Sequence, residues 1–299
     1  MEPFTVIGVP IDSVGRDGGT EHGPAALREL GLVEALDARD EGDLEVRIRG
    51  DERDPATGIL ASDDVLAATA AIRARVAKLI GTRRKPFLAG GCCAELPGAL
   101  AGARDAIGPL GLVHLDGHAD LYDGETSTTG EAADMPVSVA LGLGPRAWVE
   151  AAGGPSTAPQ HTALLGYRDE RESIEDGMRQ PRSLSPAPIL RPLELVRAAG
   201  PDAVATELAA RLRSAVPFWL HFDVDVLDQD VFPATDYLMP GGASWDEVTA
   251  LLAPLLSSPA LLGASLACYN PDKDPDQSCG RALVEALGAA RQQLPRTRS

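Results

Sequence analysis

The sequence predicts an α/β fold in which a mainly parallel central sheet is covered by helices on both faces. Along the 299 residues, short runs that are apolar throughout alternate with amphipathic helical patterns. Strands that are apolar at every position and are separated by helices are typical of parallel sheets buried on both faces. In addition, acidic residues directly follow two of these runs, as ligand-binding groups do at the carboxyl ends of parallel strands.

The spacing of the apolar residues predicts each element. Strands are expected where short aliphatic and aromatic runs are bounded by turn residues, and helices where apolar residues recur three and four positions apart. In chain order, the expected strands are residues 4–11, 44–48, 86–88, 111–115, 163–166, 217–222 and 261–267. The expected helices are residues 24–38, 63–80, 203–214, 245–256 and 281–294.

Two segments fit neither pattern. Residues 121–134 follow the first acidic cluster and are expected to form an active-site loop. Residues 168–188 are rich in charged side chains and are expected to be an exposed loop or a short helix. Because neither segment has the length or composition of a domain linker, a single domain is expected over residues 1–299.

Composition restricts the class of protein. Hydrophobic residues make up 44% of the chain and charged residues 24%, which is ordinary for a soluble globular protein. The formal net charge of −17 argues against nucleic acid or an anionic membrane as a partner, because both attract basic surfaces. We see no signal-peptide pattern and no apolar run of membrane-spanning length, so a cytoplasmic location is expected. The cysteines are therefore expected to be thiols rather than disulfides. They are Cys92, Cys93, Cys268 and Cys279.

Five potential metal ligands follow two of the expected strands. An Asp-x-His-x-Asp segment ends one apolar run, and an Asp-x-Asp segment ends another about a hundred residues later. Side chains two residues apart share one face of an extended strand, so each set converges on one side. This pattern predicts a site for two divalent cations that share bridging carboxylates. The five residues are Asp116, His118, Asp120, Asp223 and Asp225.

These motifs, together with others in the same order, resemble those of the ureohydrolases, the family of arginase, agmatinase and formiminoglutamase. The resemblance covers nearly the whole chain, and a series of ordered motifs of this kind is highly specific. The matching segments are Gly19-Thr20-Glu21-His22-Gly23-Pro24, Ala89-Gly90-Gly91-Cys92-Cys93, Asp116-Gly117-His118-Ala119-Asp120, Phe222-Asp223-Val224-Asp225-Val226-Leu227-Asp228, Pro233-Ala234-Thr235, Pro240-Gly241-Gly242 and Asn270-Pro271.

The resemblance implies a three-layer α/β/α sandwich with a binuclear manganese site. Carboxylate-rich ligation suits manganese, and two such ions can hold a bridging hydroxide that attacks the substrate. The catalytic residues that the resemblance implies, together with that hydroxide, are His118 and Asp120. The implied ligands are the bridging Asp116 and Asp223, Asp120 with Cys93 for one ion, and His118 with Asp225 for the other.

Three positions depart from the family pattern. The first histidine ligand of the family falls on Cys93, the histidine that relays protons falls on Ala133, and the glutamate that faces the substrate guanidinium falls on Cys268. Cys93 has two interpretations: a thiolate ligand, since a metal can deprotonate cysteine, or a small buried residue beside a single-metal site. A thiolate would also favour zinc in a recombinant preparation. Cys92 faces the other way and is expected to be structural.

The two other departures concern the substrate. The guanidinium of arginine is always protonated and requires an anionic partner, and its amine leaving group requires an acid. Ala133 and Cys268 offer neither, whereas an N-hydroxyguanidine is less basic and brings its own hydroxyl group. We therefore expect a guanidino amino acid, N-hydroxy-L-arginine, to be cleaved to hydroxyurea and L-ornithine.

Polar loop residues are candidates for binding the amino-acid end of this substrate. Each of them alone is more often a solvated loop residue, and Tyr122 replaces an asparagine that arginase has. The candidates implied by the resemblance are Thr129, Glu131, Tyr122 and Cys268, with the acidic set Asp169, Glu170 and Glu172.

Other functions stay open at this point. The chain could be an arginase or agmatinase with an unmodified guanidino substrate, a non-catalytic metal-binding relative, or a hydrolase with Cys93 as nucleophile and His118 as base. Residues 295–299 are too few for the C-terminal arm with which animal arginases trimerise, so a monomer is expected.

Overall fold

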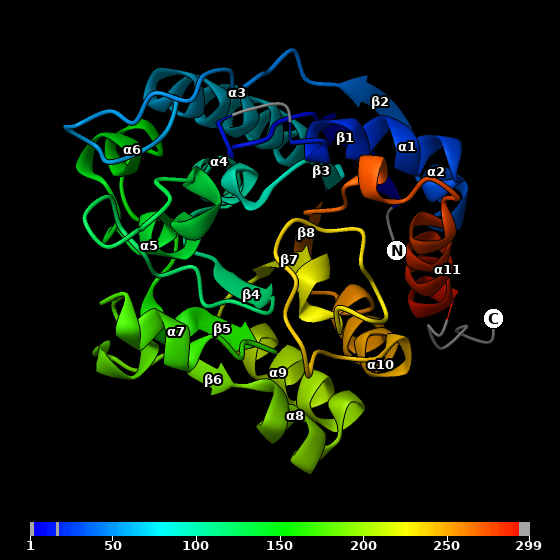
Figure 1. The fold of residues 1–299 in the computed structure, drawn as a ribbon. Helices are drawn as coiled ribbons and strands as arrows, with labels where there is room; N and C mark the ends of the chain where they lie inside the picture. Colours follow the sequence, from blue (N-terminus) through cyan, green and yellow to red (C-terminus); the bar gives the residue numbers. More distant parts are fainter. Residues whose placement is uncertain (1–2, 16–17, 293–299) are drawn as a thin grey trace.

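An eight-stranded parallel sheet forms the centre of the described part of the chain (Figure 1). The computed structural model describes residues 3–15 and 18–292. The strand order across the sheet is β2-β1-β3-β8-β7-β4-β5-β6, and every adjacent pair is parallel. The strands are β1 (Phe4–Val9), β2 (Arg39–Asp43), β3 (Lys85–Gly90), β4 (Gly111–Leu115), β5 (Thr162–Leu165), β6 (Ile189–Arg191), β7 (Phe218–Asp223) and β8 (Leu261–Ala267).

Helices connect the strands and lie on both faces of the sheet. The α-helices are α1 (Gly23–Glu29), α2 (Leu32–Ala35), α3 (Ser62–Gly81), α4 (Leu96–Ile107), α5 (Pro136–Ala140), α6 (Arg146–Ala151), α7 (Glu170–Glu175), α8 (Leu193–Ala199), α9 (Pro201–Ala215), α10 (Trp245–Leu256) and α11 (Ser278–Gln292). Short 3₁₀ helices are η1 (Thr20–His22), η2 (Cys93–Glu95), η3 (Ala132–Asp134), η4 (Pro159–His161), η5 (Pro181–Ser183), η6 (Val224–Val226) and η7 (Pro271–Lys273).

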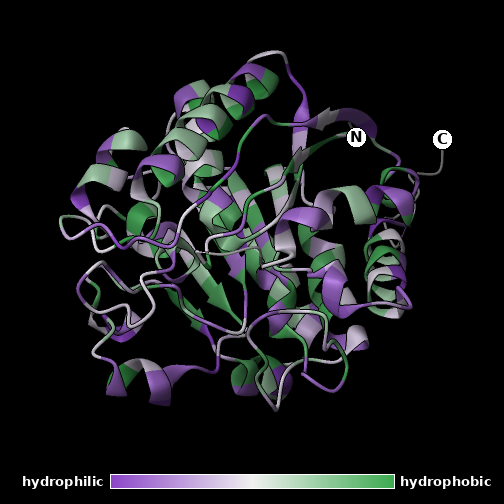
Figure 2. Cartoon of the chain, turned by 45° about the horizontal axis from the view of Figure 1, so that its top comes forward, coloured by the Kyte–Doolittle hydropathy of each residue, from purple (hydrophilic) through white to green (hydrophobic). Residues whose placement is uncertain are grey.

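Two hydrophobic cores, one on each face of the sheet, make the fold a three-layer sandwich. Alternate residues of one strand enter different cores: Val113 and Leu115 of β4 pack with α9 and α10, and Leu112 packs with α3 and α4. Figure 1 shows α3 to α6 on one side of the sheet and α9 to α11 on the other, and the central strands are largely hydrophobic in Figure 2. This architecture confirms the predicted α/β fold with helices on both faces.

Most expected strands are present, but one was misplaced. The expected strand at residues 44–48 is wrong, because β2 lies at residues 39–43 instead. β2 is a polar edge strand whose residues are mostly exposed, so it lacks the apolar signal by which the other strands were recognised. The charged segment at residues 168–188 contains the short helix α7. The three-residue strand β6, which directly follows this segment at the opposite edge of the sheet, was not expected.

The expected helix at residues 24–38 is broken into α1 and α2. Gly31 separates them, and its φ of 90° lies in the left-handed region, where glycine is the favoured residue. α10 begins as expected at Trp245, because Ser244 and Glu247 form a capping box that satisfies free N–H groups at the helix start. The end of the last expected helix, residues 293–294, and the expectation based on residues 295–299 lie outside the described residues.

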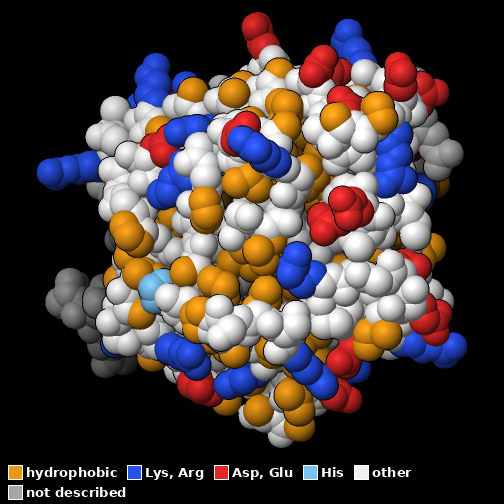
Figure 3. Space-filling model, turned by 90° about the vertical axis from the view of Figure 1, so that its left-hand side faces the viewer, with side chains coloured by type: hydrophobic (Ala, Val, Ile, Leu, Met, Phe, Trp, Pro, Cys, Tyr) orange, Lys and Arg blue, Asp and Glu red, His pale blue; other side chains and the backbone are white. Residues whose placement is uncertain are grey.

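The described helices include none that is long and apolar enough to cross a membrane. On the face that Figure 3 shows, acidic and basic side chains lie among hydrophobic ones. The net charge of −17 is therefore not concentrated on that face.

Candidate metal centre

Four neighbouring strands bring the predicted ligands to one edge of the sheet. Because β3, β8, β7 and β4 are adjacent and parallel, their carboxyl ends lie side by side. Cys93 comes shortly after β3, Cys268 directly after β8, Asp223 at the end of β7 and Asp116 directly after β4. The sheet order therefore explains why motifs that are far apart in the sequence meet in space.

Gly117 allows the two aspartate motifs to come together. Its backbone nitrogen donates a hydrogen bond to Oδ1 of Asp225 over 2.9 Å. A Cβ atom at this position would lie 2.8 Å from the carbonyl oxygen of Asp225 and 2.7 Å from the guanidinium of Arg168. A larger residue at position 117 would therefore push the ends of β4 and β7 apart.

Two residues of the cluster have a left-handed backbone although neither is glycine. The φ angles are 50° at Asp120 and 69° at Cys268. Such conformations cost roughly 1–3 kcal/mol and persist only where the surrounding structure holds them. At Cys268, the backbone nitrogen donates to the carbonyl oxygen of Gly91 over 2.7 Å, which ties the end of β8 to the loop after β3. The strained backbone conformation at these two residues therefore sets the direction of their side chains.

Direct contacts link the side chains of the cluster. Nδ1 of His118 lies 2.8 Å from Oδ2 of Asp225, and the backbone nitrogen of His118 donates to Oδ1 of Asp116 over 2.6 Å. The Cys93 thiol donates to Oδ2 of Asp223 over 2.7 Å. The backbone nitrogen of Asp225 donates to Oδ1 of Asp223 over 2.7 Å. Five of the six predicted ligands therefore form one connected group, and Asp120 lies beside it, with Oδ2 3.3 Å from Nε2 of His114.

Burial and mutual repulsion raise the pKa of most carboxyl groups here. Burial, together with the like charges of Asp225 and Asp120, raises the pKa of Asp116 to about 8. Burial also raises the pKa of Asp120 and that of Asp223 well above their usual range. Asp225 is the exception: burial raises its pKa, but the charge and the hydrogen bond of His118 outweigh this and lower it to about 2. The protein itself thus provides too little positive charge for this group, and divalent cations would provide it.

Several buried polar atoms also lack a hydrogen-bond partner. They include Oδ2 of Asp116, Oδ2 of Asp120 and both ring nitrogens of His114. Nε2 of His114 lies 3.3 Å from each of the two carboxylate oxygens without a hydrogen bond to either. Unpaired buried polar atoms are costly, so this observation fits residues that hold metal ions. Three overlapping sets of potential ligands share Asp116: Cys93-Asp116-His221-Asp223, His114-Asp116-Asp120 and Asp116-His118-Asp225.

Two of these ligand-type residues were missed from the sequence. His114 and His221 are fully buried and lie two residues before Asp116 and Asp223, respectively. The two-residue period that identified the aspartates also places each histidine on the same strand face as the aspartate that follows it. That signal was present, but both histidines lie inside runs that were read only as apolar strands.

Comparison with known proteins identifies the family. A family model described as the arginase family matches residues 2–290. The chain belongs to the arginase family. This confirms the resemblance to the ureohydrolases, and the arginase-family chain is accordingly an amidinohydrolase.

Relatives of this arginase-family chain are similar over their whole length. The arginase of Bacillus subtilis (strain 168) is 28% identical over 293 residues, which are 95% of this chain and 96% of that protein. The solved structure of Bacillus caldovelox arginase has a TM-score of 0.85 and 25% identity, and covers 99% of this chain and 100% of that one. Proclavaminate amidino hydrolase from Streptomyces clavuligerus has a TM-score of 0.69 at 20% identity and shares the fold, with 98% of this chain and 92% of that one covered.

A cavity of about 100 Å³ opens onto the cluster of the arginase-family chain. Of the predicted substrate-binding residues, Tyr122, Thr129 and Cys268 line it. Glu131 is not among the residues that line the cavity. Its carboxylate accepts a hydrogen bond from the hydroxyl of Tyr237, and Tyr237 does line the cavity. Ala133 also lines the cavity, next to the cluster. The structure thus brings together three of the four predicted substrate contacts and places the fourth behind a tyrosine.

Four further acidic side chains line the same cavity. Of the predicted acidic set, Asp169 and Glu172 line it, whereas Glu170 instead pairs with Arg182. Oδ1 of the buried Asp169 has no hydrogen-bond partner. Asp134 and Asp176, which the sequence did not indicate, also line the cavity. Cys268 and Ala133 themselves offer no carboxylate, but other carboxylates line the same cavity.

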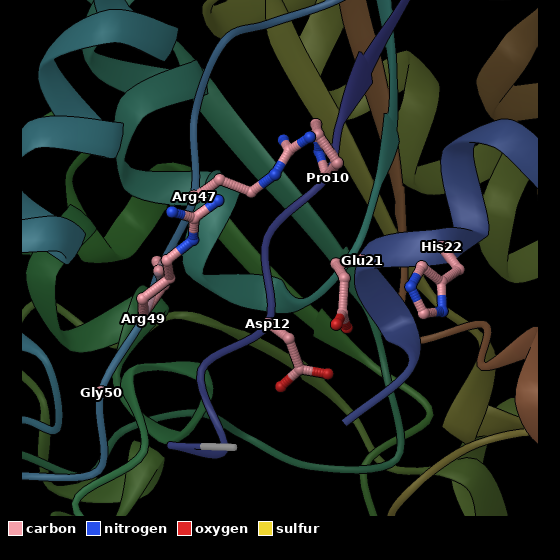
Figure 4. Close-up of a pocket in the computed structure, with 8 residues that line it drawn as sticks. Pro10, Asp12, Glu21, His22, Arg47, Arg49 and Gly50 are labelled. Atoms are coloured by element: carbon pink, nitrogen blue, oxygen red, sulfur yellow. The ribbon is translucent and has the colours of Figure 1, made fainter. Parts of the chain in front are cut away.

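A larger cavity of about 450 Å³ lies beside the N-terminal loop (Figure 4). Its acidic residues are already engaged, since Asp12 accepts hydrogen bonds from Thr20 and Val14, and Glu21 accepts one from the backbone nitrogen of Gly19. None of the three sets of potential metal ligands found in the described residues includes a residue of this cavity. The ligand-type cluster, rather than the larger volume, therefore marks the candidate site.

Proposed function

We propose that this arginase-family chain is a binuclear manganese amidinohydrolase that cleaves N-hydroxy-L-arginine to hydroxyurea and L-ornithine. The observation that carries the substrate is the cavity wall, where Cys268 and Ala133 lie beside the ligand cluster. The family resemblance implies a carboxylate and a histidine at these two positions. The same departures resemble the hydroxyarginine amidinohydrolase of D-cycloserine biosynthesis. The direct test is to compare the release of ornithine from N-hydroxy-L-arginine, L-arginine and agmatine after reconstitution with manganese.

Six residues would hold the two ions. Their carboxylate-rich donor set suits manganese. When bound, the ions would supply a water nucleophile at neutral pH and stabilise charge that develops at the guanidino carbon. The protein contributes a dry site, because every carboxylate of the set is buried, and it orients His118 through Asp225. The six residues are Cys93, Asp116, His118, Asp120, Asp223 and Asp225.

The guanidino end of the substrate meets a neutral wall. The hydrogen bond from Cys93 lowers the pKa of the Cys268 thiol, but burial raises it well above the usual value, so the thiol stays protonated. Arginine would bring a full positive charge to this wall. The side chain of Ala133 offers no proton, and the backbone N–H of this residue already donates to Oγ of Ser13 over 3.2 Å. A neutral N-hydroxyguanidine requires no anion there, and its hydroxyl group can carry the proton that the leaving amine takes up.

The acidic residues of the cavity suit the other end of an amino-acid substrate. Asp169 and Glu172 line the cavity, and Asp134 accepts hydrogen bonds from Ser127 and Thr129. These carboxylates would attract the α-ammonium group of an amino-acid substrate, and they would also attract the distal amine of agmatine. The hydroxyl group of Thr129 donates its proton to Asp134 over 2.7 Å, so Thr129 would act by holding that carboxylate at the cavity wall. An amino acid therefore fits the cavity better than a simple guanidine.

Glu131 predicts how substrate binding depends on pH. Burial raises the pKa of Glu131 to about 7, although the hydrogen bond from Tyr237 lowers it. The carboxyl is neutral below this pH and anionic above it, so its attraction for the α-ammonium group grows as the pH rises. We expect KM to fall several-fold between about pH 6 and pH 8. Glu131→Gln should remove most of this change when KM is measured across that range.

The matched control for this prediction is Glu125→Gln, since Glu125 is an exposed acidic residue of the same loop. This variant should keep the pH dependence of the native enzyme. If Glu131→Gln kept it as well, the titrating group would lie elsewhere and the charge of Glu131 would not act on the substrate.

Cys93→His should preserve the metal cluster. The family resemblance implies an imidazole at this position, and imidazole is a competent donor for the same divalent ions. We expect two equivalents of manganese per chain in the variant, measured by elemental analysis after dialysis. The sign of the rate change is not specified, because a neutral ligand makes the ions stronger Lewis acids and their water less basic. Loss of one ion with retention of the other would show that the thiol is not an interchangeable ligand.

Substrate comparison and inhibition experiments distinguish the alternative functions. An arginase or agmatinase would share the cluster and differ only in the substrate comparison above. A hydrolase with Cys93 as nucleophile is disfavoured, because the thiol is 3% exposed and burial raises its pKa well above the usual value. Chelation by EDTA, reversed by manganese, should abolish the activity, whereas a thiol enzyme would ignore EDTA and lose activity with iodoacetamide. A non-catalytic relative would bind metal and turn over none of the three substrates.

A further inference from the structure

His221 lies beneath Cys93 in the core of the site. It is on β7, two residues before Asp223, and is fully buried. Its Nε2 atom lies 3.2 Å from Sγ of Cys93. Its Nδ1 atom lies 2.7 Å from Oγ of Ser265 on the neighbouring strand β8. The imidazole thus connects the sheet to the position where the family resemblance implies a histidine ligand.

The ring of His221 is held from three directions. In the sheet register, His221 pairs with His114 of β4 on one side and with Ser265 of β8 on the other. The two imidazoles stack, with centroids 5.3 Å apart and an interplanar angle of 18°. Ser265 is positioned by Nε1 of Trp219, which donates to its hydroxyl oxygen over 3.0 Å. Histidine ligands of metals are commonly fixed in this way, by a polar partner on the nitrogen that does not face the metal.

The ring nitrogen of His221 that faces Cys93 also lies near two carboxylates of the cluster. Nε2 of His221, Sγ of Cys93 and one carboxylate oxygen each of Asp116 and Asp223 all lie within 4.8 Å of one another. Bonds from a divalent ion to nitrogen, oxygen or sulfur donors are about 2.0–2.3 Å long. Donors bound to one ion are therefore separated by at most about 4.0–4.6 Å, and the 4.8 Å within which this set lies is just outside that range. Small side-chain adjustments on metal binding would allow a single ion to reach all four atoms.

We propose that His221 supplies the imidazole that position 93 lacks, so that one ion is bound by Cys93, Asp116, His221 and Asp223. This inference rests on the proposed function of the cluster as a divalent-metal site. A set of one thiolate, one imidazole and two carboxylates is softer than the set of Asp116, His118 and Asp225 on the other side of Asp116. The first site therefore takes a borderline-soft ion such as zinc or cobalt more readily than the second. The two ions of the pair have unequal affinities and are loaded in order.

The test is a cobalt titration of the metal-free native protein and of His221→Gln. Glutamine can place an N–H group near the position of Nε2 and keep the contact with Cys93, but an amide nitrogen does not bind metal. We expect the native chain to bind two equivalents and His221→Gln to bind one, with the affinity of the lost ion reduced at least about 10²-fold. The absorption from the cobalt–thiolate bond should weaken with it. Two equivalents bound with native affinity in a folded His221→Gln variant would overturn the proposal.

Two further measurements support this experiment. Cys93→His in the His221→Gln background should restore the second equivalent, because it returns an imidazole to the same ion. In native protein labelled with ¹⁵N-histidine, zinc should shift ring nitrogens of both His118 and His221, and a shift at His118 alone would contradict the proposal without relying on the folding of a variant. If the native protein bound no metal at all, the proposed function would fail, which is a different result from loss of one ion in the variant.

Discussion

Asp116→Ala should abolish hydrolysis and release both metal ions. Asp116 belongs to all three sets of potential ligands, so each ion would lose a donor and the pair would lose the carboxylate between them. Loss of a residue that only supports a ligand typically costs 10–100-fold in metal affinity or activity, and loss of a shared ligand should cost more. We expect turnover below detection and less than one equivalent of bound manganese, measured by elemental analysis and by ornithine release.

The matched control is Asp230→Ala, since Asp230 is an exposed aspartate in the loop that follows the second aspartate motif. This variant should retain two ions and native turnover. A purified Asp116→Ala protein with two equivalents of manganese and normal activity would refute the assignment of the cluster.

The same aspartate should destabilise the metal-free protein at high pH. Burial, with the charges of Asp225 and Asp120, raises the pKa of Asp116 to about 8, far above its value in an unfolded chain. A carboxyl with a raised pKa binds its proton more tightly when folded, so its contribution to stability is lost as the pH rises from about 4 through 8. Metal-free Asp116→Asn should therefore be more stable than the native chain at pH 9, as measured by thermal unfolding. Metal binding should reverse the order, because only the native carboxylate holds the ions.

The elements that were located correctly from the sequence have a strong hydrophobic pattern. β4 and β8 are largely apolar and were predicted with their observed bounds. The position of β2 was predicted wrongly because an edge strand pairs on one side only and its side chains need not be buried. α4 was missed: residues 96–103 are all buried, and its charged residues are confined to the last turn. Hydrophobicity patterns therefore reveal amphipathic helices and short, fully apolar strands. They miss polar edge strands and buried helices.

The convergence of the candidate metal ligands was predictable for a related reason. The aspartates sit at alternate positions at strand ends, which is a local pattern, and parallel strands bring such ends together. The cavity wall is not local: Asp134, Asp169 and Tyr237 come from three different loops that close over the strand ends. Their meeting depends on loop conformation, including the left-handed backbone of Asp120 and Cys268, which no spacing in the sequence reports.

N-hydroxy-L-arginine should be hydrolysed much faster than L-arginine. Arginine would place its charged guanidinium beside the protonated Cys268 thiol, and its leaving amine would find no imidazole at Ala133. General acid assistance is typically worth about 10²–10⁴ in rate. The N-hydroxyguanidine avoids both losses, since it binds in its neutral form and carries its own proton donor. We expect a ratio of kcat/KM of at least about 10² in its favour, with manganese present.

Cys268→Glu supplies the matched test of this preference. It returns a carboxylate to the position where the family resemblance implies one, 3.6 Å from Cys93 in the native thiol contact. The variant should bind arginine more tightly and so lower the ratio, while the absence of an acid at position 133 should keep arginine slower. Cys268→Ser, which leaves the wall neutral, should keep the native preference. A native ratio near one, or one in favour of arginine, would return this chain to the arginases that act on the unmodified guanidino group. The carboxylates of Asp134, Asp169 and Glu172 at the cavity wall would then be the anions that meet its charge.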